Sequence, residues 1–205
     1  AFTTGTQNVA IGAEAGDNIT TGAGHVFIGY QAGDAVTTSQ NSVAIGNGAL
    51  RDGSGGTNTI AIGVFAGLVN TVESLFIGAS SGQYTTSGAG NVAIGSKAGY
   101  GNNTGASNTY VGFESGKGVA NNANSNNTGL GYRSLLAITT ATGNTAIGYQ
   151  SGDSITTSGE NTFVGYQAGA ALTGGSGTNI AMGYQPLYLG TANSNAIAIG
   201  GRAGY

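Results

Sequence analysis

Few residues of this chain have side chains that could do catalytic chemistry. The 205 residues include one histidine, His25, and no cysteine. A nucleophilic triad needs an imidazole held between a nucleophile and an acid, so this composition offers almost no material for one. His25 also takes the place that asparagine holds in other units of the repeat described below, which predicts a turn residue and not a catalyst.

The acidic residues do not form a recognisable catalytic site either. All eight are scattered around the repeat, whereas the paired carboxylates of a glycoside hydrolase need a fixed separation in a cleft. Asp17 and Asp34 recur at the same place in adjacent units, which makes them a weak candidate for a calcium site. We favour two turn aspartates partly screened by water, because the G-G-x-G-x-D pattern of calcium-binding rolls is absent. We therefore expect no enzyme activity, no cofactor and no metal.

Aromatic residues followed by glutamine form a pattern that could bind a ligand. Each pair directly follows a recurring glycine, and the pairs are Tyr30-Gln31, Tyr149-Gln150, Tyr166-Gln167 and Tyr184-Gln185. One interpretation is a row of rings and amides that contacts a surface or stacks on sugars. The interpretation that we favour is that the tyrosines fill a groove between copies of the chain and hydrogen-bond at its rim.

An internal repeat positions all of these residues. A glycine closes a signature close to Ala-Ile-Gly in twelve units, most of them 17 residues apart. The twelve glycines are Gly12, Gly29, Gly46, Gly63, Gly78, Gly95, Gly112, Gly131, Gly148, Gly165, Gly183 and Gly200. We number each unit from this glycine, which is called position 0. The units fill residues 1–205 as one repeat domain, and without a leader segment the chain resembles a fragment of a longer fibre.

The columns of the repeat predict a short strand in every unit. Positions −1 and −3 are aliphatic or threonine and alternate with their neighbours, so they share one strand face, which we expect to form the core. Asparagine recurs at position −4, where a stacked column would shape a corner. The glycine content excludes helices, and one unit is too small to fold alone, so stacking must satisfy its backbone. The prediction is an all-β, parallel β-solenoid of about twelve 17-residue coils.

Position −2 forms a second apolar column without a charged member. A strand that is apolar on both faces is normally covered on both. Either the chain folds back over this column, or parallel copies cover it in a cyclic assembly about the rod axis. We favour the second arrangement, with an interface between copies at Phe27, Ala44, Phe76, Tyr110, Ala146 and Phe163.

The longest step of the repeat, 19 residues from Gly112 to Gly131, breaks this regularity. It contains KGVANNANSNN (117–127), which is too polar to fill a core. We expect a loop or bulge that projects from the rod at this point.

The repeat resembles two groups of surface proteins. NSVAIGNGAL (41–50) and NVAIGSKAG (91–99) are similar to the head repeats of trimeric autotransporter adhesins. NTAIGYQSG (144–152) and NTFVGYQAG (161–169), with their TTSG spacer, are similar to repeats of bacteriophage tail fibres. The resemblance covers all twelve units and implies a left-handed parallel β-roll, a homotrimer and attachment to a surface. The chain departs from the adhesin head in its longer unit and in the Tyr-Gln after the glycine.

These observations favour a structural and adhesive rod of an extracellular fibre, on a phage tail or a bacterial cell surface. Its partners would be its own copies and a host glycan or protein receptor. The alternative is an ice-binding solenoid, but its paired threonines are adjacent, so their side chains face opposite ways. A net charge of −3 without a basic patch argues against nucleic-acid binding. Without an apolar run of about 18 residues, no membrane insertion is expected.

Overall fold

The computed structural model describes residues 5–54, 56–173, 177–188 and 194–204. In these ranges the regular structure consists of twelve short strands, and no helix is present. The strands are β1 (Val9–Ile11), β2 (Val26–Ile28), β3 (Val43–Ile45), β4 (Ile60–Ile62), β5 (Ser74–Ile77), β6 (Asn91–Ile94), β7 (Thr109–Val111), β8 (Thr128–Leu130), β9 (Thr145–Ile147), β10 (Thr162–Val164), β11 (Ile180–Met182) and β12 (Ile197–Ile199).

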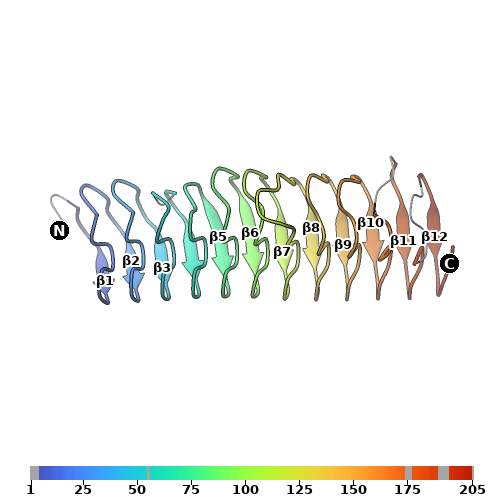
Figure 1. Cartoon of the computed structure of the whole chain (residues 1–205), viewed down its shortest axis with the longest axis horizontal. Coiled ribbons are helices and arrows are strands. Elements are labelled where there is room, and N and C mark those ends of the chain that lie inside the picture. Colours follow the sequence, from blue (N-terminus) through green and yellow to red (C-terminus); the bar gives the residue numbers. More distant parts are fainter. Residues whose placement is uncertain (1–4, 55, 174–176, 189–193, 205) are drawn as a thin grey trace.

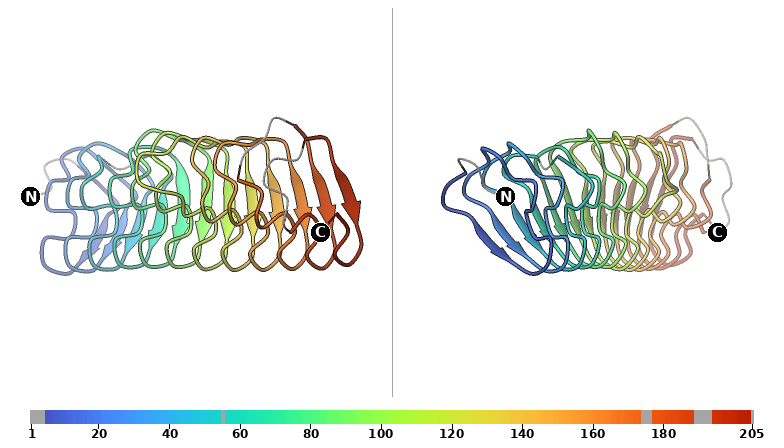
Figure 2. Two further views of the ribbon diagram at one scale, coloured as in Figure 1. Left: turned by 45° about the vertical axis from the view of Figure 1, so that its right-hand side comes forward. Right: turned by 60° about the vertical axis from the view of Figure 1, so that its left-hand side comes forward.

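The strands form one parallel sheet in which each pairs with its neighbours in the sequence, from β1 to β12. Each coil contributes one strand, and the rest of the coil returns as turns around the other sides of a rod (Figure 1, Figure 2). The register is kept throughout: Ala10 pairs with Phe27, and Tyr110 still pairs with Gly129 across the 19-residue step. Twelve strands in this order make a β-solenoid of about eleven turns. The predicted parallel solenoid is confirmed.

The prediction of which strand face forms the core is wrong. The position −2 residues point into the coil: Phe27 and Phe163 have no exposed surface, and Tyr110 is 1% exposed. Positions −1 and −3 lie on the outside instead, where Ile147 is 37% exposed. All six residues expected between copies of the chain are therefore buried inside a single chain, namely Phe27, Ala44, Phe76, Tyr110, Ala146 and Phe163.

The reason lies in the part of the coil opposite the strand. Position +3 is a buried alanine or serine in most coils, as in Ala32 and Ser151, and position +7 contributes buried aliphatics such as Ile19 and Ile155. Together with position −2, these residues close a narrow interior that has no space for the two further columns at −1 and −3. Alternation shows that the two faces of a strand differ, but when both faces are apolar it does not show which one is inside.

The narrow interior explains where large side chains occur along the rod, at positions −2 and +4 of the coils. Where position −2 is aromatic, position +4 is glycine, and a Cβ added at Gly33 would lie 2.5 Å from the Phe27 ring. Where position −2 is alanine or glycine, position +4 can be a buried leucine. The leucine coils pair Ala44 with Leu50, Gly129 with Leu135 and Ala181 with Leu187. Each coil thus has space for one large side chain at these two positions, as close packing requires.

A ladder of asparagines at position −4 forms one corner of the rod, as predicted. The Oδ1 of each asparagine accepts hydrogen bonds from the backbone N and the Nδ2 of the next, for example 3.0 and 2.8 Å from Asn161 to Asn144. The ladder runs through Asn91, Asn108, Asn127, Asn144, Asn161 and Asn179. Because these side chains are almost fully buried, their paired amides satisfy groups that would otherwise be costly to bury.

The closing glycine at position 0 is required by both conformation and space. Gly29 has a φ of +132°, which side chains other than glycine rarely adopt. A Cβ at Gly29 would lie 2.7 Å from the carbonyl oxygen of Gly46 in the next coil. The same close approach recurs from coil to coil, which explains why this residue is constant in the repeat.

The long step between β7 and β8 is partly a projecting loop and partly core. Residues 119–121 are exposed, and Val119 is 62% exposed, as the loop prediction requires. Asn122 and Asn124 turn inward and are buried, contrary to that prediction. They are accommodated because they hydrogen-bond inside the coil: the Tyr110 hydroxyl donates to Asn124 Oδ1 at 2.5 Å, and Asn124 Nδ2 donates to Asn122 Oδ1.

Candidate functional site

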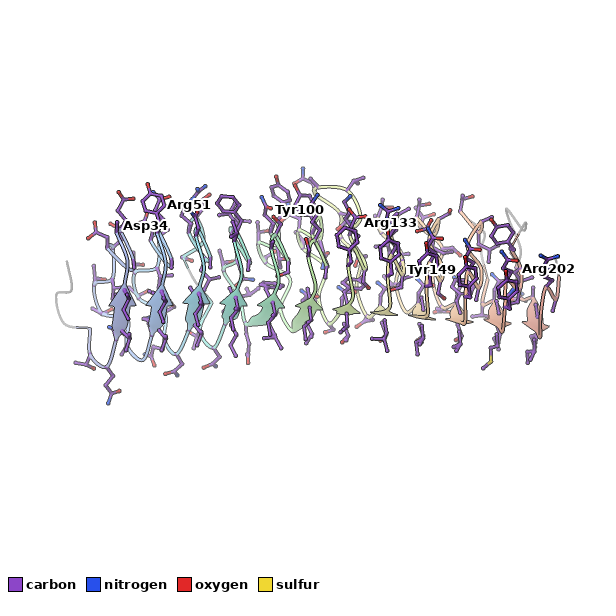
Figure 3. All side chains as sticks on the ribbon, turned by 90° about the horizontal axis from the view of Figure 1, so that it is seen from below. Asp34, Arg51, Tyr100, Arg133, Tyr149 and Arg202 are labelled. Atoms are coloured by element: carbon purple, nitrogen blue, oxygen red, sulfur yellow. The ribbon has the colours of Figure 1, made fainter. Side chains whose placement is uncertain are left out.

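One exposed surface of the rod is the outer strand face, formed by positions −1 and −3 of the twelve strands. Neither position is charged in any unit. The most exposed members, between 36% and 72%, are Val9, Ile11, Ile60, Leu130, Ile147, Ile180, Met182, Ile197 and Ile199. In Figure 3 these columns project together from one side of the sheet along the whole rod. Contiguous exposed apolar surface of this extent marks an interaction site in soluble proteins.

The aromatic residues at position +1 form a continuous stack. Ring centroids lie 5.1 Å apart between Tyr132 and Tyr149 and between Tyr149 and Tyr166, and 5.2 Å between Tyr166 and Tyr184. Phe113 begins the stack, 5.5 Å from Tyr132. Each inner ring is covered on both faces by its neighbours, so it offers edges and hydroxyls to a ligand. The faces of Tyr149 and Tyr166 are thus occupied by neighbouring rings and are not open for stacking on a sugar. The favoured interpretation, in which the tyrosines fill a groove between copies of the chain, stays a prediction.

Glutamines at position +2 form a second ladder beside the rings. Gln167 Nε2 donates to Gln150 Oε1 at 2.9 Å, and Gln185 Nε2 donates to Gln167 Oε1 at 2.8 Å. These residues adopt a left-handed backbone, with φ near +50°. Each Nε2 carries two N–H groups and the ladder uses one, so amide donors are left over for a ligand. Near the other end of the rod, Tyr30 is 48% exposed and Gln31 Nε2 donates to Glu14 instead, at 2.7 Å.

A groove opens beside this glutamine ladder, over the coils of β9, β10 and β11. Its volume is about 370 Å³, and it is lined by Gln150, Gln167, Asp153, Ala170, Ala171 and Tyr188. Asp153, Ala170 and Tyr188 all occupy position +5 in consecutive coils, so the alanine leaves a gap between an acid and an aromatic ring. Sequence reasoning missed this groove, although the change of size along position +5 is visible in the sequence.

Asp153 is the charged side chain of the groove. Burial raises its pKa, while the positive charge of Arg133 lowers it, and the net pKa lies above the usual value. Its Oδ1 is buried and has no hydrogen-bond partner among the residues that the structure describes. A buried acceptor without a donor costs about 1–3 kcal/mol. The groove wall therefore contains a carboxyl group with one oxygen buried and unpaired, which favours the protonated form of Asp153.

The acidic pair considered for calcium lies at the opposite end of the rod. Burial, together with the charges of Glu14 and Asp17, raises the pKa of Asp34, and Asn18 Nδ2 donates to its Oδ1 at 3.1 Å. In the described ranges, no group of three or more His, Asp or Glu side chains is placed to hold a metal ion. Calcium prefers at least six oxygen ligands, so the geometry gives this candidate no support.

Other charged side chains form local pairs. Glu114 is bound by Lys117 Nζ at 2.9 Å and Arg133 Nε at 2.8 Å. Burial raises the pKa of Glu114, but these two hydrogen bonds outweigh it, so that pKa lies below its usual value. The arrangement neutralises a buried carboxylate and leaves it unsuited to act as a general acid at neutral pH.

His25 is a structural turn residue, as predicted. It has no exposed surface and replaces asparagine in the −4 column. The Ser42 backbone N–H donates to its Nδ1 at 3.2 Å, and its Nε2 lies 2.9 Å from the Ser39 carbonyl oxygen, which sets the proton on Nε2. Burial lowers the pKa of His25 despite these hydrogen bonds, so the ring is held neutral.

The fold and these surfaces define a β-solenoid repeat protein. Comparisons with protein-family models, with curated protein sequences and with solved structures find no match to this chain. Over the described ranges, the structure contains no helix with the length and apolar character needed to cross a membrane.

Proposed function

We propose that this chain is a segment of a homotrimeric, left-handed β-solenoid rod in an extracellular fibre, either a phage tail fibre or a bacterial surface adhesin. The rod performs no catalysis and attaches its owner to a host or another surface. The observation that carries the proposal is the outer strand face. It is uncharged on all twelve strands, aliphatic except for threonine at position −3 of β7 to β10, and partly or fully exposed throughout.

The outer strand face replaces the position −2 column as the contact between copies. Burying half-exposed aliphatic side chains stabilises an assembly by up to about 1 kcal/mol for each side chain. The columns hold two aliphatic positions in eight coils and one in the four coils of β7 to β10. Because parallel copies have the same coil spacing, equivalent residues of these columns lie at the same height along the rod in every copy. This geometry suits closed cyclic symmetry about an axis parallel to the rod. The number of copies and the left-handed coil come from the resemblance to trimeric adhesins.

Solution mass tests this proposal. Sedimentation equilibrium of residues 1–205 should give three times the chain mass of 19.9 kDa. Replacing Ile94 and Ile147 by Asp together should reduce the mass to that of one chain, because both side chains lie on the outer strand face. A matched control replaces the exposed Thr157, which lies outside the strands, by Asp. A wild-type mass of one chain would contradict the proposed rod.

Ice binding is the alternative function. An ice-binding face needs rows of threonine hydroxyls that can order water. Here several donate to carbonyl oxygens of the next coil, such as Thr139 to Thr156 at 2.9 Å and Thr156 to Thr173 at 2.7 Å. A measured thermal hysteresis of residues 1–205 would favour this alternative, and host adsorption without hysteresis would favour the fibre.

A further inference from the structure

The groove over the coils of β9 to β11 has the chemistry of a carbohydrate subsite. A hexopyranose combines hydroxyl groups, which donate and accept hydrogen bonds, with an apolar C–H face. The groove provides amide donors and acceptors from Gln150 and Gln167, a carboxyl acceptor from Asp153 and the ring of Tyr188. Its volume of about 370 Å³ is within the range of small-ligand sites.

The charge of the groove selects among sugars. Asp153 lies in the groove wall, and its Oδ1 has no hydrogen-bond partner among the described residues. That oxygen is buried, so a sugar hydroxyl in the groove would donate to the other oxygen of the carboxyl, whereas the carboxylate of an acidic sugar would add a like charge. No basic side chain lines the groove to offset that repulsion. The groove therefore suits a neutral sugar.

The spacing of the polar groups selects the linkage. The neighbouring rings Tyr149 and Tyr166 repeat every 5.1 Å along the rod, and the glutamines at the next position follow the same coils. An extended β-1,4-linked hexose chain advances by nearly this distance for each sugar, while an α-1,4-linked chain curves away. Three coils at about 4.8 Å each span the length of two to three sugars.

We propose that this groove binds a neutral, extended β-1,4-linked glycan that lies along the rod axis, an inference that rests on the proposed function in attachment. The Gln150 and Gln167 amides and the Asp153 carboxyl hydrogen-bond its hydroxyls, and Tyr188 contacts its C–H face. Asp153 is the sole carboxyl group among the lining residues, so the groove lacks the second one that glycoside hydrolysis requires and the glycan is held without cleavage.

The groove stays accessible in the proposed assembly. Figure 3 labels Asp34, Arg51 and Tyr100, which share position +5 with Asp153 and lie along the edge of the rod farthest from the strands. Copies that pack through the outer strand face leave this edge open. A trimer would present three such grooves, and simultaneous contact with a surface glycan would multiply a weak single-site affinity.

Calorimetric titration and saturation-transfer NMR of residues 1–205 with four oligosaccharides test the proposal. Cellotetraose and chitotetraose carry the extended β-1,4 linkage, maltotetraose carries the curved α-1,4 linkage, and sialyllactose is acidic. At least one β-1,4 probe should bind, and the other two should bind at least tenfold more weakly. Failure of both β-1,4 probes to bind, or preference for maltotetraose or sialyllactose, would overturn the proposal.

Two pairs of variants locate the site. Ala171→Lys fills the groove and should weaken binding at least tenfold, whereas Ala35→Lys, at the same position +6 of the β2 coil, should leave it unchanged. Tyr188→Ala should weaken binding, and Tyr100→Ala should not. Full binding by Ala171→Lys would overturn the proposal. The solution mass of the same samples tests the trimeric rod separately, since both lysine positions lie outside the outer strand face.

Discussion

Replacement of Phe163 by Ala should destabilise the rod locally, because Phe163 is the large side chain in the interior of its coil. The ring has no exposed surface, and it lies between the position +4 glycines of its own coil and the preceding one. A Cβ on Gly169 would lie 2.6 Å from the ring, and one on Gly152 would lie 2.9 Å from it. Backbone packed this closely cannot collapse into the space, so we expect a loss of about 3–5 kcal/mol.

A second substitution tests whether the interior accepts one large side chain per coil. Gly169→Leu alone should be destabilising, because its Cβ would collide with the Phe163 ring. In the Phe163→Ala background the same leucine should recover part of the lost stability, since the next coil already combines Ala181 with Leu187. The double-mutant cycle should therefore show a favourable coupling of about 1–3 kcal/mol.

Hydrogen exchange by mass spectrometry measures these effects coil by coil. Protection should fall around β9 to β11 in Phe163→Ala and stay unchanged around β2 and β3, because contacts in a solenoid join neighbouring coils only. Unchanged protection near β10, combined with a lower solution mass, would refute the buried position of Phe163. That result would indicate that Phe163 lies in the interface between copies of the chain, as predicted from the sequence.

Three other perturbations test the outer strand face, the asparagine ladder and His25 one at a time. Ile147→Asp should change the unfolding free energy of the isolated chain by less than about 1 kcal/mol and still lower the solution mass, and a mass that does not change would count against the face. Asn144→Ala removes the Oδ1 that accepts hydrogen bonds from the backbone N and the Nδ2 of Asn161, so urea titration should show a loss of about 1–3 kcal/mol, and a neutral effect would disprove the ladder. Burial lowers the pKa of His25 in the folded chain below its ordinary value of 6.5. The neutral ring therefore contributes its full stability above pH 6.5, and this contribution is lost as the pH falls through the lowered pKa. The protection factor near β2, which is the exchange rate corrected for the intrinsic rate at each pH, should therefore fall in acid for wild type but not for His25→Asn.

The architecture could be predicted from the sequence because the repeat fixes it. Adjacent coils approach too closely at position 0 for any Cβ, so glycine is required there wherever a further coil follows. Each glycine at position 0, such as Gly29, therefore marks one coil in the sequence. Asparagines at position −4 mark the corner, because their side chains pair along the rod. The periodicity therefore predicted the strand that every coil contributes and the register between coils.

The inside and the outside of the strand could not be predicted in the same way. Ile147 and its neighbour Ala146 are both apolar, and hydrophobicity alone favoured the larger side chain for the core. The deciding factor was the width of the interior, which depends on the buried alanines and serines across the coil, such as Ser151. Bulky aliphatics at every −1 and −3 position would not fit there.

The groove was missed for a different reason. Tyr188 and Asp153 are separated by 35 positions in the sequence, yet they lie two coils apart on the same edge of the rod. A site formed by a missing side chain, here at Ala170, gives no positive signal in a repeat. It becomes visible only when the same position is compared across consecutive coils.

Thiol cross-linking between copies tests the central claim, that the outer strand face joins parallel chains, most directly. The chain has no cysteine, so Ile147→Cys introduces a unique thiol on this face, and Ala171→Cys introduces one on the opposite edge. A short bismaleimide applied to dilute protein should couple two chains through Cys at position 147 and leave the variant at position 171 uncoupled. Coupling at position 171 but not at 147, or no coupling together with the mass of one chain, would contradict the proposed assembly.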